Sequence, residues 1–287
     1  MNYISYCLFD TKNINQRMHR DWDIHRTEID RYWYNIPANF IINSNLYPDF
    51  KIKLYISENY TSHPLYPLLQ LLGKQDNFSL NVIKTKYNNT EPTMWRMIPL
   101  WNEDTENLLC RDIDSLPTIN EVKATKEFLN SDFLIHTMRT HRNHNAYPTK
   151  ILAGLCGFKK EVVEHIPIKN FSDYYKKSNG GWGVDQNTLI EIFYANIADK
   201  KNLFLDSPIK TDIHDVRMND DTGYIDFTQN DYKHELLTFI DSFTTWSGEP
   251  IDFRKDNLKQ LLEFDYKECE LLKNFFAENE EIKNFYL

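Results

Sequence analysis

The sequence predicts an α/β protein in which helices flank a mainly parallel sheet. Short β-branched and aromatic runs recur along residues 1–225, and longer helical patterns separate them. Parallel strands need such crossover connections, so this alternation favours a parallel sheet. From residue 226 the chain becomes helical and acidic. This shift predicts two parts, a sheet-containing domain (1–225) and a helical extension (226–287) that packs on it.

The predicted strands are short, and helical or turn-forming stretches separate them. They are Tyr3–Phe9, Lys51–Ser57, Phe78–Thr85, Asn107–Cys110, Asp132–Arg139 and residues 202–207. Helices are expected at 15–35, at Thr93–Trp101 with an end or bend near Pro99, at 118–132, and at Val184–Lys200. Thr118 and Glu121 have the spacing of a capping box at the start of the third helix.

Composition restricts the class of protein. The 287 residues are 41% hydrophobic and 26% charged, which is typical of a globular chain. A net charge of −9 argues against general affinity for nucleic acid or anionic lipid. The four cysteines are far apart and form no C-x-x-C pair, so we expect free thiols rather than a zinc site or disulfide framework. With no signal peptide and no long apolar run, we expect a soluble, cytoplasmic protein without a membrane span.

Two carboxylates follow the strand at Asn107–Cys110, in the sequence "NLLCRDIDS". With a strand period of two, Asp112 and Asp114 would point to the same side. Like charges so placed favour a shared cation, and Mn²⁺ or Mg²⁺ held by carboxylates and substrate phosphates fits this pattern. The alternative is a solvated turn in which Asp114 caps the next helix.

The residues around this pair resemble a group of bacterial and viral GT-A-type glycosyltransferase-like proteins. The group shares W-R-F-x-P, R-D-x-D-S and H-x-M-R-D-H-x-x-H. The matching positions here are Trp95-Arg96, Arg111–Ser115, His136, Met138, Arg139, His141 and His144. This chain departs from the pattern at Thr140, where the group has Asp, and at Ala153-Gly154, where the group has a Gly pair.

The resemblance implies a GT-A-like fold and a metal-dependent transfer of a hexose from a nucleotide sugar, UDP-hexose first, to an acceptor hydroxyl. The acceptor could be a glycan, a lipid-linked molecule or another hydroxyl compound. The implied ligands of Mn²⁺ (or Mg²⁺) are Asp112, Asp114 and His214, and Asp215 or a purely structural His214 is the alternative. The implied donor-binding residues are Tyr6, Phe9, Asp10, Arg96, Arg111, Arg139, His141, Gly154 and Trp182. Arg96 and Arg111 could instead form ordinary ion pairs, and a zinc site at His141 and His144 is less favoured than donor binding.

A second resemblance concerns the Asp185-Gln186 pair in "GGWGVDQNTLIEIF". It is similar to the Asp-Gln pair of the retaining family that contains glycogenin and lipopolysaccharide galactosyltransferases. This likeness implies catalytic roles, with Asp185 holding sugar hydroxyls, Gln186 facing the anomeric carbon, and transfer with retention. The alternatives are that Asp185 is a helix N-cap, or that it is the base of an inverting enzyme.

Two other function classes remain open. A nucleotidyl- or phosphotransferase would share the need for metal and phosphate, but the sequence contains no P-loop or G-x-G-x-x-G motif. A non-catalytic binding protein on the same fold is the other alternative.

Overall fold

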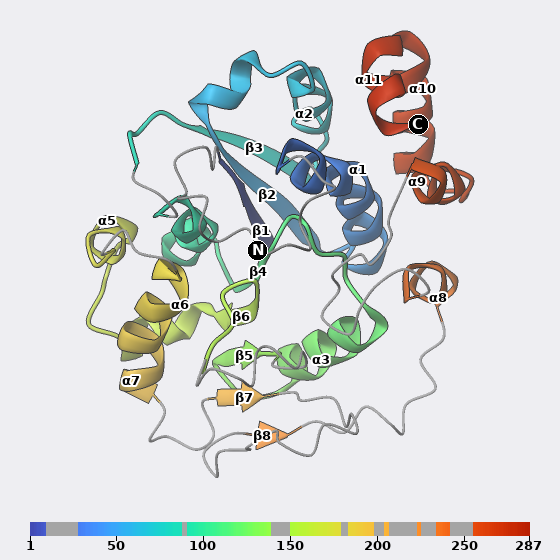
Figure 1. The fold of residues 1–287 in the computed structure, drawn as a ribbon. Coiled ribbons are helices and arrows are strands. Elements are labelled where there is room, and N and C mark those ends of the chain that lie inside the picture. The colour runs from blue at the N-terminus through green and yellow to red at the C-terminus, as the bar shows by residue number, and fades with distance from the viewer. Residues whose placement is uncertain are drawn as a thin grey trace, which may run out of the picture.

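An eight-stranded sheet forms the centre of the protein (Figure 1). The computed structural model describes residues 1–9, 28–87, 91–138, 150–178, 183–197, 204–206, 223–224, 234–241 and 255–287. Within these residues the strand order is β3-β2-β1-β4-β6-β5-β7-β8. Of the predicted site residues, Asp10, Arg139, His141, Trp182 and His214 lie outside the described ranges.

The sheet is mainly parallel, as the sequence predicts. Its strands are β1 (Asn2–Leu8), β2 (Phe50–Ser57), β3 (Phe78–Ile83), β4 (Asn107–Arg111), β5 (Ile135–Thr137), β6 (Leu155–Lys159), β7 (Phe204–Asp206) and β8 (Gly223–Tyr224). Only β6 runs antiparallel to its neighbours β4 and β5 among the described pairings. Strand β6 was not among the predicted strands, and it enters the sheet between two strands that precede it in the chain.

Helices surround the sheet. They are α1 (Glu28–Leu46), α2 (Tyr66–Leu72), α3 (Ile119–Asn130), α5 (Phe171–Tyr175), α6 (Val184–Leu189), α7 (Ala195–Ile197), α8 (Glu235–Asp241), α9 (Lys255–Leu262), α10 (Lys267–Glu278) and α11 (Glu280–Tyr286). Short 3₁₀ segments are η3 (Glu58–Ser62), η4 (Glu91–Trp101) and η5 (Lys160–His165), and the π-helical turn η6 (Ile190–Tyr194) joins α6 to α7. No described helix is long and apolar enough to cross a membrane.

Side-chain alternation along β1 divides the core into two layers. Ile4, Tyr6 and Leu8 belong to the layer that contains α1, α2 and the C-terminal helices. Tyr3 packs in the opposite layer with η4, η5, α5 and α6. Figure 1 shows α1 and α9–α11 on one side of the sheet and α5–α7 on the other. The α/β class predicted from the sequence is therefore confirmed, whereas the division at residue 225 stays a prediction.

Helix α1 extends beyond its predicted end at Asn35 and contains Pro37. Proline has no backbone N–H, so the Trp33 carbonyl, four residues earlier, lacks its normal helical donor. The Tyr286 hydroxyl donates to this carbonyl over 3.0 Å, and both side chains are buried. A second bond, from the Tyr34 hydroxyl to the Phe285 carbonyl at 2.8 Å, holds the same two helices together. The proline thus creates the acceptor to which α11 binds.

We expect the Tyr286→Phe substitution to lower the free energy of unfolding by about 1–3 kcal/mol, because it leaves the buried Trp33 carbonyl without a donor. In a Pro37→Ala background the restored helical N–H can bond that carbonyl, so the same substitution should cost much less. Urea denaturation of the four proteins measures both costs. An equal loss of stability in the two backgrounds would contradict this explanation.

Candidate active site

The order of the strands places a change of direction between β1 and β4. From β1 the chain adds β2 and β3 on one side and then returns to add β4 on the other, all parallel. In open α/β sheets, ligands bind beyond the carboxyl ends of the strands at such a switch point. Asp112 follows the last residue of β4 directly. The carboxylate pair therefore begins where this topology favours a binding site.

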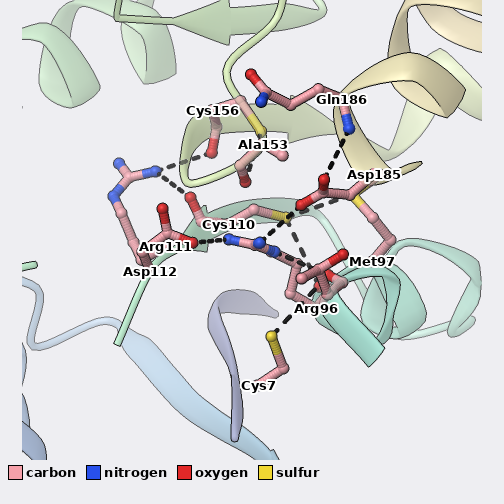
Figure 2. Close-up of polar contacts among 11 residues, drawn as sticks. Cys7, Arg96, Met97, Cys110, Arg111, Asp112, Ala153, Cys156, Asp185 and Gln186 are labelled. Carbon is pink, nitrogen blue, oxygen red and sulfur yellow. Dashed lines mark hydrogen bonds and ion pairs between the residues drawn. The ribbon is translucent and has the colours of Figure 1, made fainter. Parts of the chain in front are cut away.

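The Arg96 guanidinium joins two carboxylates that are far apart in sequence, as Figure 2 shows. Its Nη1 donates to Asp112 Oδ1, and its Nη2 donates to Asp185 Oδ2 over 2.8 Å. Its Nε donates to the Thr93 carbonyl over 2.8 Å, which fixes the third side of the group. We call Arg96, Asp112 and Asp185 the Arg96 triad. It connects η4, the end of β4 and the first turn of α6.

Burial and charge act in opposite directions on Arg96. Its side chain is 4% exposed, and desolvation alone would lower its pKa. The negative charges of Asp112 and Asp185 instead raise the pKa of Arg96 well above its usual value. The side chain of Asp185 is 11% exposed, whereas that of Asp112 is 49% exposed. Asp112 is therefore the member of the triad that remains accessible to a ligand.

Gly154 lies directly against the Asp112 carboxylate. A Cβ atom at this position would stand 1.9 Å from Asp112 Oδ2. The Gly154 carbonyl also accepts the Asp112 backbone N–H over 3.3 Å. A side chain here would displace the carboxylate, so glycine is required for the observed orientation of Asp112.

Residues Asp112–Ser115 form a turn, which we call the carboxylate turn. Strand β4 ends at Arg111, and the Ser115 N–H donates to the Asp112 carbonyl over 3.1 Å. The strand period therefore does not extend to Asp114, and the same-side argument made from it does not apply. The N-cap of α3 is Thr118, whose hydroxyl accepts the Glu121 N–H over 3.2 Å. The alternative in which Asp114 caps this helix is wrong.

The described residues do not by themselves complete a metal site. Among them, no group of three or more His, Cys, Asp and Glu side chains could hold a metal ion. Asp112 Oδ1 is already bound by Arg96. The third predicted ligand, His214, falls outside the described part of the chain. The metal therefore stays a prediction from the sequence.

Asp185 and Gln186 lie in the first turn of α6, where the N-cap is Gly183 rather than Asp185. Gly183 has φ 68°, a left-handed conformation that favours glycine. The Gln186 backbone N–H donates to Asp185 Oδ1 over 2.9 Å, so both Asp185 oxygens accept hydrogen bonds. The Gln186 side-chain oxygen is buried and has no hydrogen-bond partner among the described residues, and Figure 2 shows this side chain turned away from Arg96.

Arg111 occupies a different environment from that expected of a donor-binding residue. Its buried guanidinium pairs with Glu121 and donates to the carbonyls of Cys110 (2.9 Å) and Cys156 (2.8 Å). Burial opposes its charge, but Glu121 raises its pKa well above the usual value. These contacts join β4, β6 and α3, as in the ion-pair alternative. They give no support to a contact with a diphosphate.

The two predicted donor-binding residues of β1 and its end differ in position. The Tyr6 ring is 2% exposed in the core, and its hydroxyl donates to Asn39 Oδ1 over 3.2 Å, so this geometry does not support a ligand contact. Phe9 follows the carboxyl end of β1 and is partly buried. Its ring lies edge-on to those of Tyr87 and Trp95, with centroids 6.3 Å and 6.4 Å away. Phe9 thus lies beside the carboxyl end of β1, on the side of the sheet where a ligand is expected.

Three buried asparagines on α1, Asn35, Asn39 and Asn43, were not among the predicted site residues. Two of them donate to backbone carbonyls of the carboxylate turn. Their spacing of four residues within the otherwise apolar "NIPANFIIN" was the available signal, because such a spacing aligns side chains on one helix face.

Comparison with known proteins gives similarity to solved structures alone. No protein-family model and no curated protein sequence matches the chain. A structure of S. aureus TarS 1–349 in complex with UDP is 12% identical, with a TM-score of 0.44, 96% of this chain covered and 72% of that chain. The mannosyltransferase PcManGT from Pyrobaculum calidifontis, in complex with GDP-Man and Mn²⁺, is 11% identical, with a TM-score of 0.42 and coverages of 68% and 52%. A 4-diphosphocytidyl-2C-methyl-D-erythritol synthase from Anaerococcus prevotii is 13% identical, with a TM-score of 0.38 and coverages of 66% and 82%. At these values the likeness does not assign an activity to this chain.

We expect Arg96→Met to lower the free energy of unfolding by roughly 3 kcal/mol, because it leaves the buried Asp185 carboxylate without its cation. Asp185→Asn in the same chain should recover part of this loss. Chemical denaturation measures both. The matched control is Lys176→Met, which removes an exposed pair with Asp173 and should have no measurable effect. A loss for Arg96→Met as small as that of the control would refute the structural role of the triad.

Proposed function

We propose that this chain is a glycosyltransferase that moves a hexose from a nucleotide sugar, UDP-hexose first, to an acceptor hydroxyl. The observation that carries the proposal is the Arg96 triad at the carboxyl end of β4. The triad joins Arg96, which the first resemblance implies for donor binding, Asp112, which it implies for the metal, and Asp185, which the second resemblance implies for catalysis. Gly154, also implied by the resemblance, lies against the same carboxylate.

The charge balance of the triad favours a ligand rich in hydroxyl groups. Two carboxylates face one guanidinium, so acceptor capacity exceeds donor capacity when both are ionised. Sugar and ribose hydroxyls are donors that match such a surface. Arg96 and Gly154 orient the half-exposed Asp112 carboxylate in advance of binding, which reduces the cost of ordering it.

A phosphate would not be bound by this surface alone, because it would meet the Asp112 carboxylate. We therefore include the divalent ion, Mn²⁺ or Mg²⁺, in the proposal, with Asp112, Asp114 and His214 as its expected ligands. When bound, such an ion supplies Lewis-acid stabilisation to a leaving diphosphate.

We also propose that transfer proceeds with retention at the anomeric carbon. Both Asp185 oxygens already accept hydrogen bonds, from Arg96 and from the Gln186 backbone. This arrangement suits a carboxylate that holds sugar hydroxyls better than one that must take a proton from the acceptor. Gln186, a neutral amide, cannot act as that base, and its side-chain oxygen has no hydrogen-bond partner among the described residues.

Incubation with a panel of UDP- and GDP-sugars and Mn²⁺ should release nucleoside diphosphate as the hexose passes to water or to an added hydroxyl acceptor. A parallel incubation with nucleoside triphosphates and a sugar phosphate would release pyrophosphate if the chain were a nucleotidyltransferase. Asp114→Asn should abolish Mn²⁺-dependent UDP binding in calorimetry while the fold survives, because it removes a metal-binding charge. Unchanged Mn²⁺-dependent binding in that variant would end the metal assignment. Release of pyrophosphate alone would end the glycosyltransferase proposal.

Gly154→Ala provides a second variant for the same binding measurement. The added methyl group must push the Asp112 carboxylate aside, and because the carboxylate ends a flexible side chain the fold should survive while UDP binding is lost. Gly73→Ala is the matched control. Its Cβ would approach Leu80 Cβ to 3.2 Å, in a contact outside the site, so it should bind UDP as the parent protein does.

Retention is tested by proton NMR of the first product formed from an α-linked donor. We expect an α-anomeric signal with a small coupling, because the Asp185-Gln186 pair is proposed to act without an inverting base. A β-anomeric doublet with the large coupling of an inverted product would contradict the proposed stereochemistry, but not transfer itself.

A further inference from the structure

The carboxylate turn is held from the side of α1 by two asparagine side chains. Asn35 Nδ2 donates to the Asp114 carbonyl over 2.7 Å. Asn39 Nδ2 donates to the carbonyls of Ile113 and Ser115, each over 3.0 Å. Three consecutive carbonyls, 113 to 115, are therefore bound by a helix that lies about 75 residues earlier in the chain, as the separations of 74 to 79 residues show.

A second tier of bonds fixes the direction of the Asn39 amide. The Tyr6 hydroxyl donates to Asn39 Oδ1 over 3.2 Å, and Asn43 Nδ2 donates to the Tyr6 hydroxyl over 2.8 Å. With its oxygen occupied by Tyr6, Asn39 must present its NH₂ group to the turn. Asn39 and Asn43 are 4% and 2% exposed, so an amide turned the other way would leave buried polar atoms unpaired.

We propose that Asn35 and Asn39 are positioning residues that set the directions of the Asp112 and Asp114 carboxylates. Holding the carbonyls of residues 113 to 115 fixes the peptide planes of the turn, and these planes determine where the flanking Cα–Cβ bonds point. Arg96 and Gly154 act on the Asp112 side chain itself, whereas the asparagines act on the backbone beneath it. This proposal rests on the proposed function for the identity of the ligand, but its effect on the turn can be measured without any ligand.

Hydrogen exchange of the ligand-free protein tests the effect on the turn. In Asn39→Leu, which loses two bonds, the amides of the peptide that contains Asp112–Leu116 should exchange about tenfold faster. Asn35→Leu loses one bond and should show a smaller increase in the same peptide. The matched control is Asn45→Leu on the same helix, whose amide donates to the Ile41 carbonyl and to Glu268 rather than to the turn. Its turn should exchange as in the parent protein.

A third variant, Asn39→Asp, tests the loss of the hydrogen-bond donor without a change in side-chain volume. Asn39→Asp places a carboxylate against the Ile113 and Ser115 carbonyls at neutral pH, and protonation restores one donor. After correction for intrinsic exchange rates and for the change that the parent protein shows over the same pH range, protection of the turn should recover as the pH is lowered. This variant and Asn35→Leu also keep the test decisive if Asn39→Leu does not fold. The proposal would be overturned if amide exchange in the turn were unchanged in Asn39→Asp and Asn35→Leu, or if Asn45→Leu accelerated it equally.

Binding of UDP with Mn²⁺ separates this proposal from the proposed function. If the parent protein binds UDP, Asn39→Leu should bind it about tenfold more weakly, whereas Asn45→Leu should bind it with the affinity of the parent protein. The two variants are compared under conditions in which their losses of thermal stability are equal. If the parent protein binds no nucleotide, the proposed function fails, and the exchange data still decide the role of the asparagines. Unchanged affinity together with unchanged exchange would refute the positioning role while leaving the function intact.

Discussion

A buried guanidinium is the interaction on which the candidate site depends. A charge with 4% exposure is costly unless it is paired, so Arg96 requires carboxylates on more than one side. Asp112 comes from the end of β4 and Asp185 from the first turn of α6, while Thr93 contributes its carbonyl from η4. The need to pair the Arg96 charge thereby fixes the relative placement of η4, β4 and α6 at the carboxyl end of β4.

The fold class could be predicted because strand and helix patterns are encoded locally, whereas a common site for Arg96, Asp112 and Asp185 was implied only by the resemblance of their motifs to known families. The strands that were found have β-branched or aromatic runs bounded by polar residues, and Arg96, Asp112 and Asp185 each lie in a recognisable motif. The predicted capping box was only partly formed, because one of its residues makes a contact with a residue outside the motif. Thr118 caps α3 as predicted, but Glu121 pairs with Arg111 instead of completing the box. A nearby buried cation outweighs the backbone N–H that the motif would supply.

The features that were missed depend on contacts distant in sequence. Strand β6 is five residues long with a central glycine, and its place between β4 and β5 is set by pairing to both. Pro37 normally predicts the end or a kink of a helix, yet α1 continues through it because Tyr286 supplies the missing donor from the other end of the chain. The burial of Tyr6 followed from α1 packing on β1, which no motif near Tyr6 indicates.

The bond between Tyr286 and Trp33 also bears on the order of events during biosynthesis. Its partners are separated by 253 residues, which at about 5–20 residues per second takes on the order of 10–50 s to translate. Throughout that interval α1 lacks the Tyr286 hydroxyl, so the Trp33 carbonyl must be hydrated by water, and it lacks the C-terminal helices α10 and α11 that pack against it. The early strands can pair while the ribosome is still working, but the helix that holds the carboxylate turn reaches its final packing only after α11 has emerged. The packing of α1, which is translated early, is therefore completed by a helix that is translated much later.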